Sequence, residues 1–244
     1  MMWKSTGLVW ASIVLLVSLS SGQDAAAQGQ KRPANAAFQA VEDKPGLPRV
    51  LLIGDSISIG YTVPVRELMN GKANVHRAPT NCGPTTRGLE QIDQWLGDKP
   101  WDVIHFNFGL HDLKYLGPNG ENLADPQAAT SKPQVALADY EKNLRTIVAR
   151  LKKTDATLIW CATTPVPEGA KGRVVGDSAK YNEVAAKVMR ENDIATNDLY
   201  AFAKPRLAEI QRRADVHFTP DGSRALAEEV AKKITAAIEK RAAK

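Results

Sequence analysis

Short apolar runs alternate with amphipathic stretches along most of the chain. The clearest runs are "RVLLIG" (49–54), "DVIHFNFG" (102–109) and "ATLIWCATT" (156–164), and weaker ones lie at 73–78 and 193–199. Continuous apolar runs of this length, bounded by turn residues, are typical of strands that are buried on both faces. The pattern therefore predicts five strands of one parallel sheet.

Apolar residues at helical spacing indicate helices between and after these strands. One stripe consists of Tyr140, Leu144, Ile147, Val148 and Leu151, and a second consists of Leu226, Val230, Ile234 and Ile238. Each stripe places its members on one face of a helix. Thr219 can cap the second helix, and Pro220 suits its first turn. Strands that alternate with helices predict an α/β domain whose parallel sheet is covered on both faces.

Residues 1–27 have the pattern of a signal peptide. Lys4 provides a positive start, and the apolar stretch at 7–19 is too short to span a bilayer comfortably. Small residues follow, with cleavage expected after Ala27 or Gly22; an uncleaved anchor is the alternative. Residues 28–47 lack periodicity and are predicted to form a flexible leader, and residues 48–244 a single domain. We expect an exported protein, secreted or periplasmic, without a membrane partner after cleavage.

The remaining composition narrows the possible partners. The net charge of +5 comes from Lys and Arg residues spread among acids, with no basic block interleaved with aromatic residues, so no nucleic-acid partner is expected. Cys82 and Cys161 each lie beside a predicted strand end, and they can form a disulfide or stay two independent buried thiols.

Polar residues and glycines gather where the predicted strands end. Ser56 follows the first strand, Asn81 and Gly83 follow the second, His111 and Asp112 follow the third, and Asp215 and His217 precede the last helix. In open parallel sheets ligands bind beyond the carboxyl ends of the strands, so these residues can share one site. Gly, Asp and Ser are also ordinary turn residues, which is the alternative explanation of the "GDS" stretch.

The stretch "GDSIS", the Asn-x-Gly after the second strand, the Gly-x-x-Asp after the third and the late histidine together resemble the SGNH (GDSL-type) hydrolase family. The resemblance runs from about Arg49 to the C-terminus. It implies a flavodoxin-like, three-layer α/β/α fold with a five-stranded parallel sheet. It also implies a serine esterase without a cofactor, and the scattered histidines and cysteines predict no metal site.

Carried onto this sequence, the resemblance implies that Ser56 is the nucleophile and His217 the general base. An alcohol is a weak nucleophile, so an adjacent imidazole is what makes attack by serine feasible. The backbone N–H groups of Ser56 and Gly83 are expected to donate to the oxyanion, and glycine leaves room for close approach. Asn81 is a candidate for substrate binding.

Two positions depart from the family pattern. The family usually has asparagine as an oxyanion donor where this chain has His111. A neutral imidazole carries one N–H and can donate, or the hole can be one donor short, with Asn107 as a nearby alternative. The family usually places an aspartate three residues before the histidine, where this chain has Ala214; Asp215 lies only two before His217. On an extended loop that shift turns the carboxylate away, unless a one-residue kink restores contact or a backbone carbonyl orients His217.

The long stretch from Leu113 to Pro133 leaves the predicted site directly and is rich in Gly, Pro, Asn and Ala. Long loops in compact domains are usually functional or disordered, so we interpret it as a substrate wall, with Tyr115 and Lys114 as its best contacts. His105 and His76 are interpreted as structural.

These residues favour an exported esterase that cleaves small acyl esters, above all acetyl esters on carbohydrates, through an acyl-enzyme on Ser56. One alternative is an SGNH-shaped glycan-binding module with impaired catalysis, which the changes at His111 and Asp215 favour. Another is an acyltransferase, which shares the first half-reaction and passes the acyl group to a sugar hydroxyl.

Overall fold

The computed structural model describes residues 1–3 and 35–243. Most of the predicted signal peptide, at 4–27, therefore lies outside the described residues and remains a prediction. Within residues 1–3 and 35–243, no helix is both long enough and apolar enough to cross a membrane.

A five-stranded parallel sheet forms the middle layer of the domain. Its strands lie in the order β2-β1-β3-β6-β7, and each neighbouring pair is parallel. The bounds are β1 Arg49–Ile53, β2 Asn74–Arg77, β3 Val103–Phe106, β6 Thr157–Cys161 and β7 Ala195–Asn197. All five predicted strands are confirmed, each shorter than its apolar run. The apolar residues beyond the strand ends continue into the loops that carry the polar residues.

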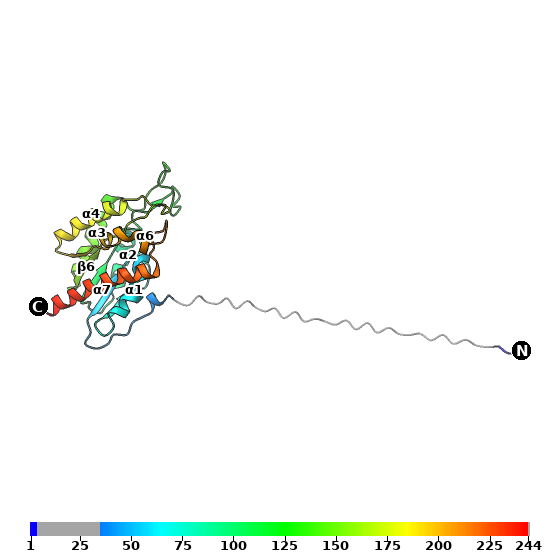
Figure 1. The fold of residues 1–244 in the computed structure, drawn as a ribbon, viewed down its shortest axis with the longest axis horizontal. Coiled ribbons are helices and arrows are strands. Elements are labelled where there is room, and N and C mark those ends of the chain that lie inside the picture. Colours follow the sequence, from blue (N-terminus) through cyan, green and yellow to red (C-terminus); the bar gives the residue numbers. More distant parts are fainter. Residues whose placement is uncertain (4–34, 244) are drawn as a thin grey trace. The chain divides into compact units, whose positions relative to one another are not determined.

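Helices cover both faces of this sheet. α1 (Ser56–Leu68) packs along α7 (Pro220–Ala242), whereas α2 (Thr85–Leu96), α3 (Leu137–Lys152) and α4 (Asp177–Glu191) pack side by side on the other face (Figure 1). Short helices α5 (Leu199–Ala203), η2 (Lys204–Arg206) and α6 (Leu207–Ile210) connect β7 to the segment before α7. The three-layer α/β/α fold predicted from the sequence is confirmed.

The two apolar stripes predicted for α3 and α7 face the core. All five members of the first stripe are buried, as are Leu226, Val230 and Ile234 of the second, while Ile238 is partly buried. The predicted cap is also present, because the hydroxyl of Thr219 accepts a hydrogen bond from the Gly222 N–H at 3.0 Å. These helices therefore form where periodicity and capping chemistry indicate.

The stretch from Leu113 to Pro133 contains a small hairpin. β4 (Tyr115–Leu116) pairs antiparallel with β5 (Lys132–Pro133). The N–H of Tyr115 also donates to the Gly172 carbonyl at 2.8 Å. A Cβ at Gly172 would overlap the backbone of Leu123, so the loop at 123 and the loop at 172 are in close contact. Strands of two residues are too short to leave a periodic pattern, which is why the sequence predicted only a loop.

Residues 35–47 of the predicted leader lie against the domain. They include η1 (Ala36–Phe38), whose Ala36 carbonyl accepts a hydrogen bond from Arg66 of α1 at 3.0 Å. The Lys44 N–H donates to the side chain of Asn74 at 2.9 Å. This part of the leader is thus held by side chains of α1 and β2, which low periodicity alone does not reveal.

Both cysteines are free and buried. Burial raises the pKa of the Cys82 thiol to about 12, and its sulfur accepts a hydrogen bond from the Gly54 N–H at 3.3 Å. Of the two alternatives that the sequence left open, the structure has two independent thiols.

Candidate active site

The serine predicted as nucleophile lies at the junction of β1 and α1. Asp55 caps α1, and its carboxylate accepts a hydrogen bond from the Ile57 N–H at 2.9 Å. Ser56 is therefore the first residue of the helix, where the N–H groups have no partner within the helix. Its own N–H makes no hydrogen bond to any described residue. The capping chemistry of "GDS" thus leaves both the hydroxyl and the N–H of Ser56 available at the sheet edge.

Arg77, which the sequence did not single out, supports this turn from beneath. Its side chain is only 7% exposed, and it donates to the Gly54 carbonyl at 3.3 Å and to the Thr80 carbonyl at 3.0 Å. It also donates to the hydroxyls of Ser58 (3.2 Å) and Thr62 (3.0 Å). One cation therefore joins the loop after β1 to the loop after β2. Its place at the end of the second predicted strand was the only indication in the sequence.

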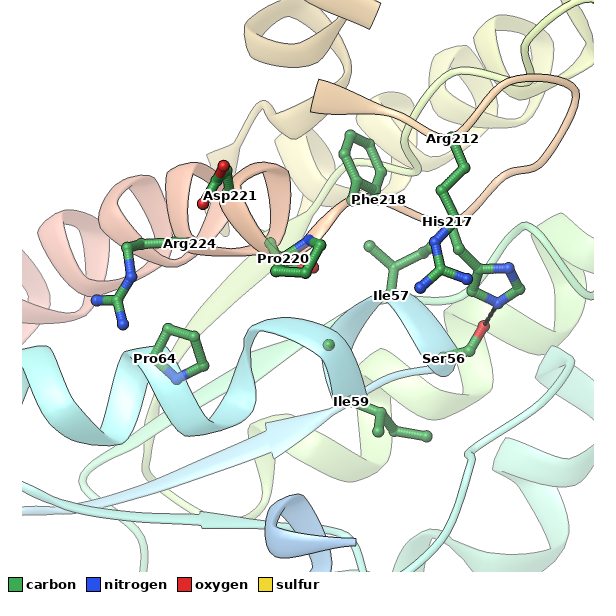
Figure 2. Close-up of a pocket in the computed structure, with 12 residues that line it drawn as sticks. Ser56, Ile57, Ile59, Pro64, Arg212, His217, Phe218, Pro220, Asp221 and Arg224 are labelled. Carbon is green, nitrogen blue, oxygen red and sulfur yellow. Dashed lines mark hydrogen bonds between the residues drawn. The ribbon is translucent and has the colours of Figure 1, made fainter. Parts of the chain in front are cut away.

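Ser56, His217 and Asp215 form a continuous chain of hydrogen-bond contacts. The Nε2 of His217 lies 2.8 Å from the Oγ of Ser56, and Figure 2 shows the two side chains pointing toward one another from α1 and from the segment before α7. The Nδ1 of His217 lies 2.6 Å from the Oδ1 of Asp215. Because Nδ1 faces a carboxylate, it carries the proton in the neutral ring and leaves Nε2 as the acceptor for the serine hydroxyl.

A kink in the backbone brings Asp215 to His217 despite the short spacing. Ala214 has a φ of +53°, in the left-handed region that residues other than glycine rarely adopt. The loop then turns back, and the Oδ1 of Asp215 also accepts the backbone N–H of His217 at 3.1 Å. The kink that the sequence left as one alternative is therefore present, and the carboxylate faces the ring.

The electrostatics of this pair favour a charged carboxylate. Burial raises the pKa of Asp215, but the hydrogen bonds from the backbone and ring of His217 outweigh burial and hold that pKa below its ordinary value. The side chains of Asp215 and His217 are 38% and 43% exposed. Solvent therefore screens this contact more than it would screen a fully buried pair.

The loop after β2 differs from the expectation in one donor. The Gly83 N–H, predicted to donate to the oxyanion, instead donates to the Oδ1 of Asn81 at 3.0 Å. Gly83 has a φ of +66°, in the left-handed region that favours glycine. Because Oδ1 accepts that hydrogen bond, the Nδ2 group of Asn81 is left as a donor, and Asn81 lines a cavity beside Ser56. Asn81, more than Gly83, presents a donor to the site.

His111 lines the same cavity as Ser56 and Asn81. Burial lowers the pKa of His111 and the nearby Asp55 opposes this, but Lys114, Arg173 and Arg87 lower it further. The ring is therefore neutral near pH 7, with one N–H. Asn107, the alternative donor, is committed elsewhere, because its Nδ2 donates to the Cys161 carbonyl at 2.7 Å.

Asp112 connects the loop after β3 to the start of α2. Its Oδ1 accepts hydrogen bonds from the N–H (2.8 Å) and the hydroxyl of Thr85, and its Oδ2 has no partner in the described part of the chain. Burial raises the pKa of Asp112 to about 7 against the effect of these hydrogen bonds. The carboxyl group thus holds two loops of the site together.

The other predicted residues lie as follows. Lys114 lines the cavity beside Ser56, but Tyr115 lines neither cavity at that serine, because β4 directs it to the hairpin. His105 is buried, which lowers its pKa to about 3, and its ring contacts the side chain of Asn197 at 3.2 Å. His76 contacts Asp43 at 2.6 Å and lines neither cavity at Ser56. The structural interpretation of these two histidines agrees with their contacts.

The order and geometry of these residues can be compared with known proteins. The model of the GDSL-like lipase/acylhydrolase family matches residues 52–225, well over half of the chain. The chain belongs to this family. It is therefore a carboxylic ester hydrolase of the SGNH/GDSL type. A search of curated proteins found no match.

Solved structures of other SGNH hydrolases have the same fold. The lipase/acylhydrolase from Enterococcus faecalis superposes with a TM-score of 0.64 at 18% identity, over 78% of this chain and 96% of that one. The acetyl xylan esterase AlAXEase superposes with a TM-score of 0.61 at 16% identity, over 76% and 99%. An acetylxylan esterase from Geobacillus stearothermophilus gives 0.61 at 17% identity, over 77% and 94%. At these identities the likeness shows the fold alone.

Proposed function

We propose that this SGNH hydrolase cleaves small acyl esters, above all acetyl esters on carbohydrates, through an acyl-enzyme on Ser56. The observation that carries the proposal is the chain of contacts from the Ser56 hydroxyl through His217 to Asp215, at 2.8 and 2.6 Å. A nucleophile, a base within hydrogen-bond reach and a group that orients the base are the three parts that nucleophilic acyl transfer requires.

Acylation follows from this geometry. The Oγ of Ser56 attacks the ester carbonyl while its proton passes to the Nε2 of His217. The carboxylate of Asp215 holds the Nδ1–H and stabilises the positive charge that develops on the ring. The tetrahedral intermediate collapses, and the proton on Nε2 passes to the departing alcohol oxygen, leaving the acyl group on Ser56.

Three donors surround the position of the oxyanion in this proposal. They are the N–H of Ser56 at the start of α1, one ring N–H of neutral His111 and the Nδ2 group of Asn81. Donors fixed before the reaction stabilise the developing negative charge without having to reorganise. His111 therefore replaces the asparagine that the family usually has, and Asn81 is a donor in place of the N–H of Gly83.

Deacylation repeats the same proton transfers with water. The Nε2 of His217 takes a proton from a water molecule as its oxygen attacks the acyl carbonyl, and the same proton then returns to Ser56 as the acid departs. Each electron pair and proton in the cycle belongs to the ester, the water or these side chains. A sugar hydroxyl in place of the water would give acyl transfer instead of hydrolysis.

Two observations support the acetyl and carbohydrate part of the proposal. Two proteins of the same fold are named acetyl xylan esterases. The cavities at Ser56 also carry charged and polar side chains, among them Lys114, Arg173 and Arg212, which suit a sugar better than a long acyl chain. Export to the periplasm or the medium is part of the proposal, because residues 1–27 have the pattern of a signal peptide.

The proposal is tested with p-nitrophenyl acetate and with acetylated xylo-oligosaccharides. Wild-type protein, Ser56→Ala and His217→Ala are compared for p-nitrophenol release and for free acetate. We expect turnover by wild type and background rates for both variants. Wild-type rates no higher than those of Ser56→Ala would refute hydrolysis, and acetyl groups recovered on an added sugar rather than as acetate would indicate a transferase.

The N-terminus of the mature protein tests export. We expect N-terminal sequencing of the protein from the periplasm or the medium to begin after Ala27 or Gly22. A chain that stays in the cell and retains residues 1–27 would contradict this part of the proposal.

A further inference from the structure

The cavity on the His111 side of Ser56 carries an excess of positive charge. It has a volume of about 520 Å³, and its lining includes Lys114, Lys171 and Arg173 together with the catalytic serine. Within residues 35–243 none of these three cations forms a salt bridge. Asp215 also lines the cavity but is bound to His217, so the three cations outnumber the one acid of the lining.

Arg173 is the most informative of the three. It is only partly exposed, and its Nε donates to the Leu110 carbonyl at 3.1 Å. Its two terminal nitrogens make no hydrogen bond to any described residue. Holding an arginine in this way places the pair of terminal N–H groups in a fixed position, and that fork matches the two oxygens of a carboxylate.

The acids near Arg173 are already engaged. Asp55 is buried and caps α1 through the Ile57 N–H, and Asp215 is bound to His217 at 2.6 Å. Burial lowers the pKa of Lys114, and the like charge of Arg173 lowers it further. Arg173 and Lys114 are partly removed from water and have no acidic partner among the described residues, so an anion from outside would be stabilised here.

The cavity on the other side of Ser56 differs in charge. It is lined by Arg212, Asp221 and Arg224 beside apolar residues such as Phe218 (Figure 2). Arg224 is paired with Glu67 at 2.9 Å, and Asp221 adds a negative charge. Arg212 has no salt bridge among the described residues, but the excess of cations is smaller here: two cations to one acid, against three to one on the side of His111 and Asn81.

Size and polarity indicate which part of the ester occupies the cationic cavity. A volume of about 520 Å³ lies within the range of roughly 300–1,000 Å³ that holds whole small-molecule ligands, and an acetyl group fills little of it. A long apolar acyl chain would place its surface against lysine and arginine. His217, which delivers the proton to the departing alcohol, lines both cavities, so the leaving group can lie on this side of Ser56. The alcohol part of the ester therefore fits here.

From these observations we infer that the ester cleaved at Ser56 is carried by an acidic sugar, a uronic acid, whose carboxylate binds Arg173 and Lys114. The inference rests on the proposed hydrolysis by Ser56 and adds the substrate class. Lys171 lies exposed at the cavity and attracts the anion as it approaches. Arg173 supplies the two-point contact that orients it.

The test uses two sugars that differ in charge alone. One is a methyl glucopyranosiduronate that carries a single O-acetyl group, and the other is the corresponding uronamide. The measured quantity is the ratio of their kcat/KM values for the full chain. We expect wild type to favour the uronate by roughly tenfold or more, the range of a charge-assisted hydrogen bond. This preference should shrink as salt is added, because exposed charges are screened.

Variants then assign the preference to residues. Arg173→Gln and Lys114→Gln should bring the ratio of kcat/KM values toward one. A change that affects kcat/KM for both substrates equally leaves this ratio unaltered. Lys142→Gln removes the same charge from α3, away from the cavity, and should keep the wild-type ratio. A wild-type ratio of one or below, or an unchanged ratio in Arg173→Gln, would overturn the inference.

Two further substrates separate the possible failures. If wild type hydrolyses p-nitrophenyl acetate but shows no preference for the uronate, the inference fails while the esterase proposal stands. If p-nitrophenyl acetate is not hydrolysed above the rate of Ser56→Ala, the proposed function itself fails. In p-nitrophenyl hemisuccinate the carboxylate is on the acyl group, and p-nitrophenyl butyrate is its uncharged counterpart. If wild type prefers the hemisuccinate to the butyrate but shows no preference for the uronate, the assignment of the cationic cavity to the alcohol is overturned.

Discussion

The carboxylate of Asp215 should contribute a measurable part of the rate, and two substitutions divide that contribution. Asp215→Asn keeps an oxygen that can accept the Nδ1–H and the backbone N–H of His217, but it removes the charge. Asp215→Ala removes the charge and both hydrogen bonds. Comparison of the two variants therefore separates the electrostatic effect from the orientation of the ring.

The structure sets the expected magnitude. With Nδ1 and Oδ1 2.6 Å apart, the centres of charge lie about 4 Å apart, and an effective dielectric constant of about 20 gives an attraction of about 4 kcal/mol. Both side chains are more than a third exposed, so we reduce this value to about 2–3 kcal/mol. That corresponds to a fall in kcat of roughly 30- to 150-fold for Asp215→Asn. Loss of the hydrogen bonds adds about 1–1.5 kcal/mol, so Asp215→Ala should fall about tenfold further.

The assay is kcat for p-nitrophenyl acetate at saturating substrate, with far-ultraviolet circular dichroism to confirm folding. Asp98→Asn removes a charge from the exposed loop between α2 and β3 and should keep the wild-type kcat. If Asp215→Ala stays within threefold of wild type, another group orients His217 and the reasoning is refuted. Equal losses in the Asn and Ala variants would show that charge alone accounts for the effect.

The oxyanion donor, the buried acid and the backbone kink each give a further prediction. His111→Ala should lower kcat roughly 10²–10³-fold through loss of one oxyanion donor, whereas His111→Asn, which restores an N–H donor, should retain most of the activity in the same assay. Because burial raises the pKa of Asp112 to about 7, the unfolded chain binds fewer protons than the folded chain between pH 4 and 7, and stability falls as pH rises through that window. Urea unfolding should show wild type losing roughly 3 kcal/mol more between pH 5 and 8 than Asp112→Asn; equal slopes would contradict the raised pKa. Ala214→Gly should keep kcat, since glycine adopts the positive φ readily, but Ala214→Val should lower kcat at least tenfold by moving Asp215; equal kcat values in both variants would show that the kink does not position the acid.

The positions of the helices and strands depend on interactions between residues close in the chain, and such interactions can be predicted directly from the sequence. Apolar runs indicated the five strands, and the "TPDG" stretch indicated the start of α7 because capping needs only residues close in the chain. The placement of Ser56, His111 and His217 at one edge followed from a general rule of parallel sheets. The fold could therefore be predicted from residue order, and the family resemblance added Ser56 and His217 as candidate nucleophile and base.

Contacts between distant segments leave no such pattern in the sequence. The pairing of β2 with β1 places Arg77 under the Ser56 turn. No motif or periodic spacing in the sequence indicates that contact. The hydrogen bond that engages the Gly83 N–H depends on how the loop after β2 turns. The commitment of Asn107 to the Cys161 carbonyl depends on the neighbour of β3 in the sheet.

Taken by itself, the sequence determined the sheet and its two covering layers, because hydrophobic periodicity and helix capping act over a few residues, and its motifs singled out Ser56 and His217 through the family resemblance. Only the tertiary structure decided that Asp215 reaches His217, since that contact depends on the positive φ of Ala214. It also decided that Lys114 and Arg173 share a cavity with Ser56. Those two cations come from segments nearly sixty residues apart, and only the packed loops beyond the sheet bring their charges together.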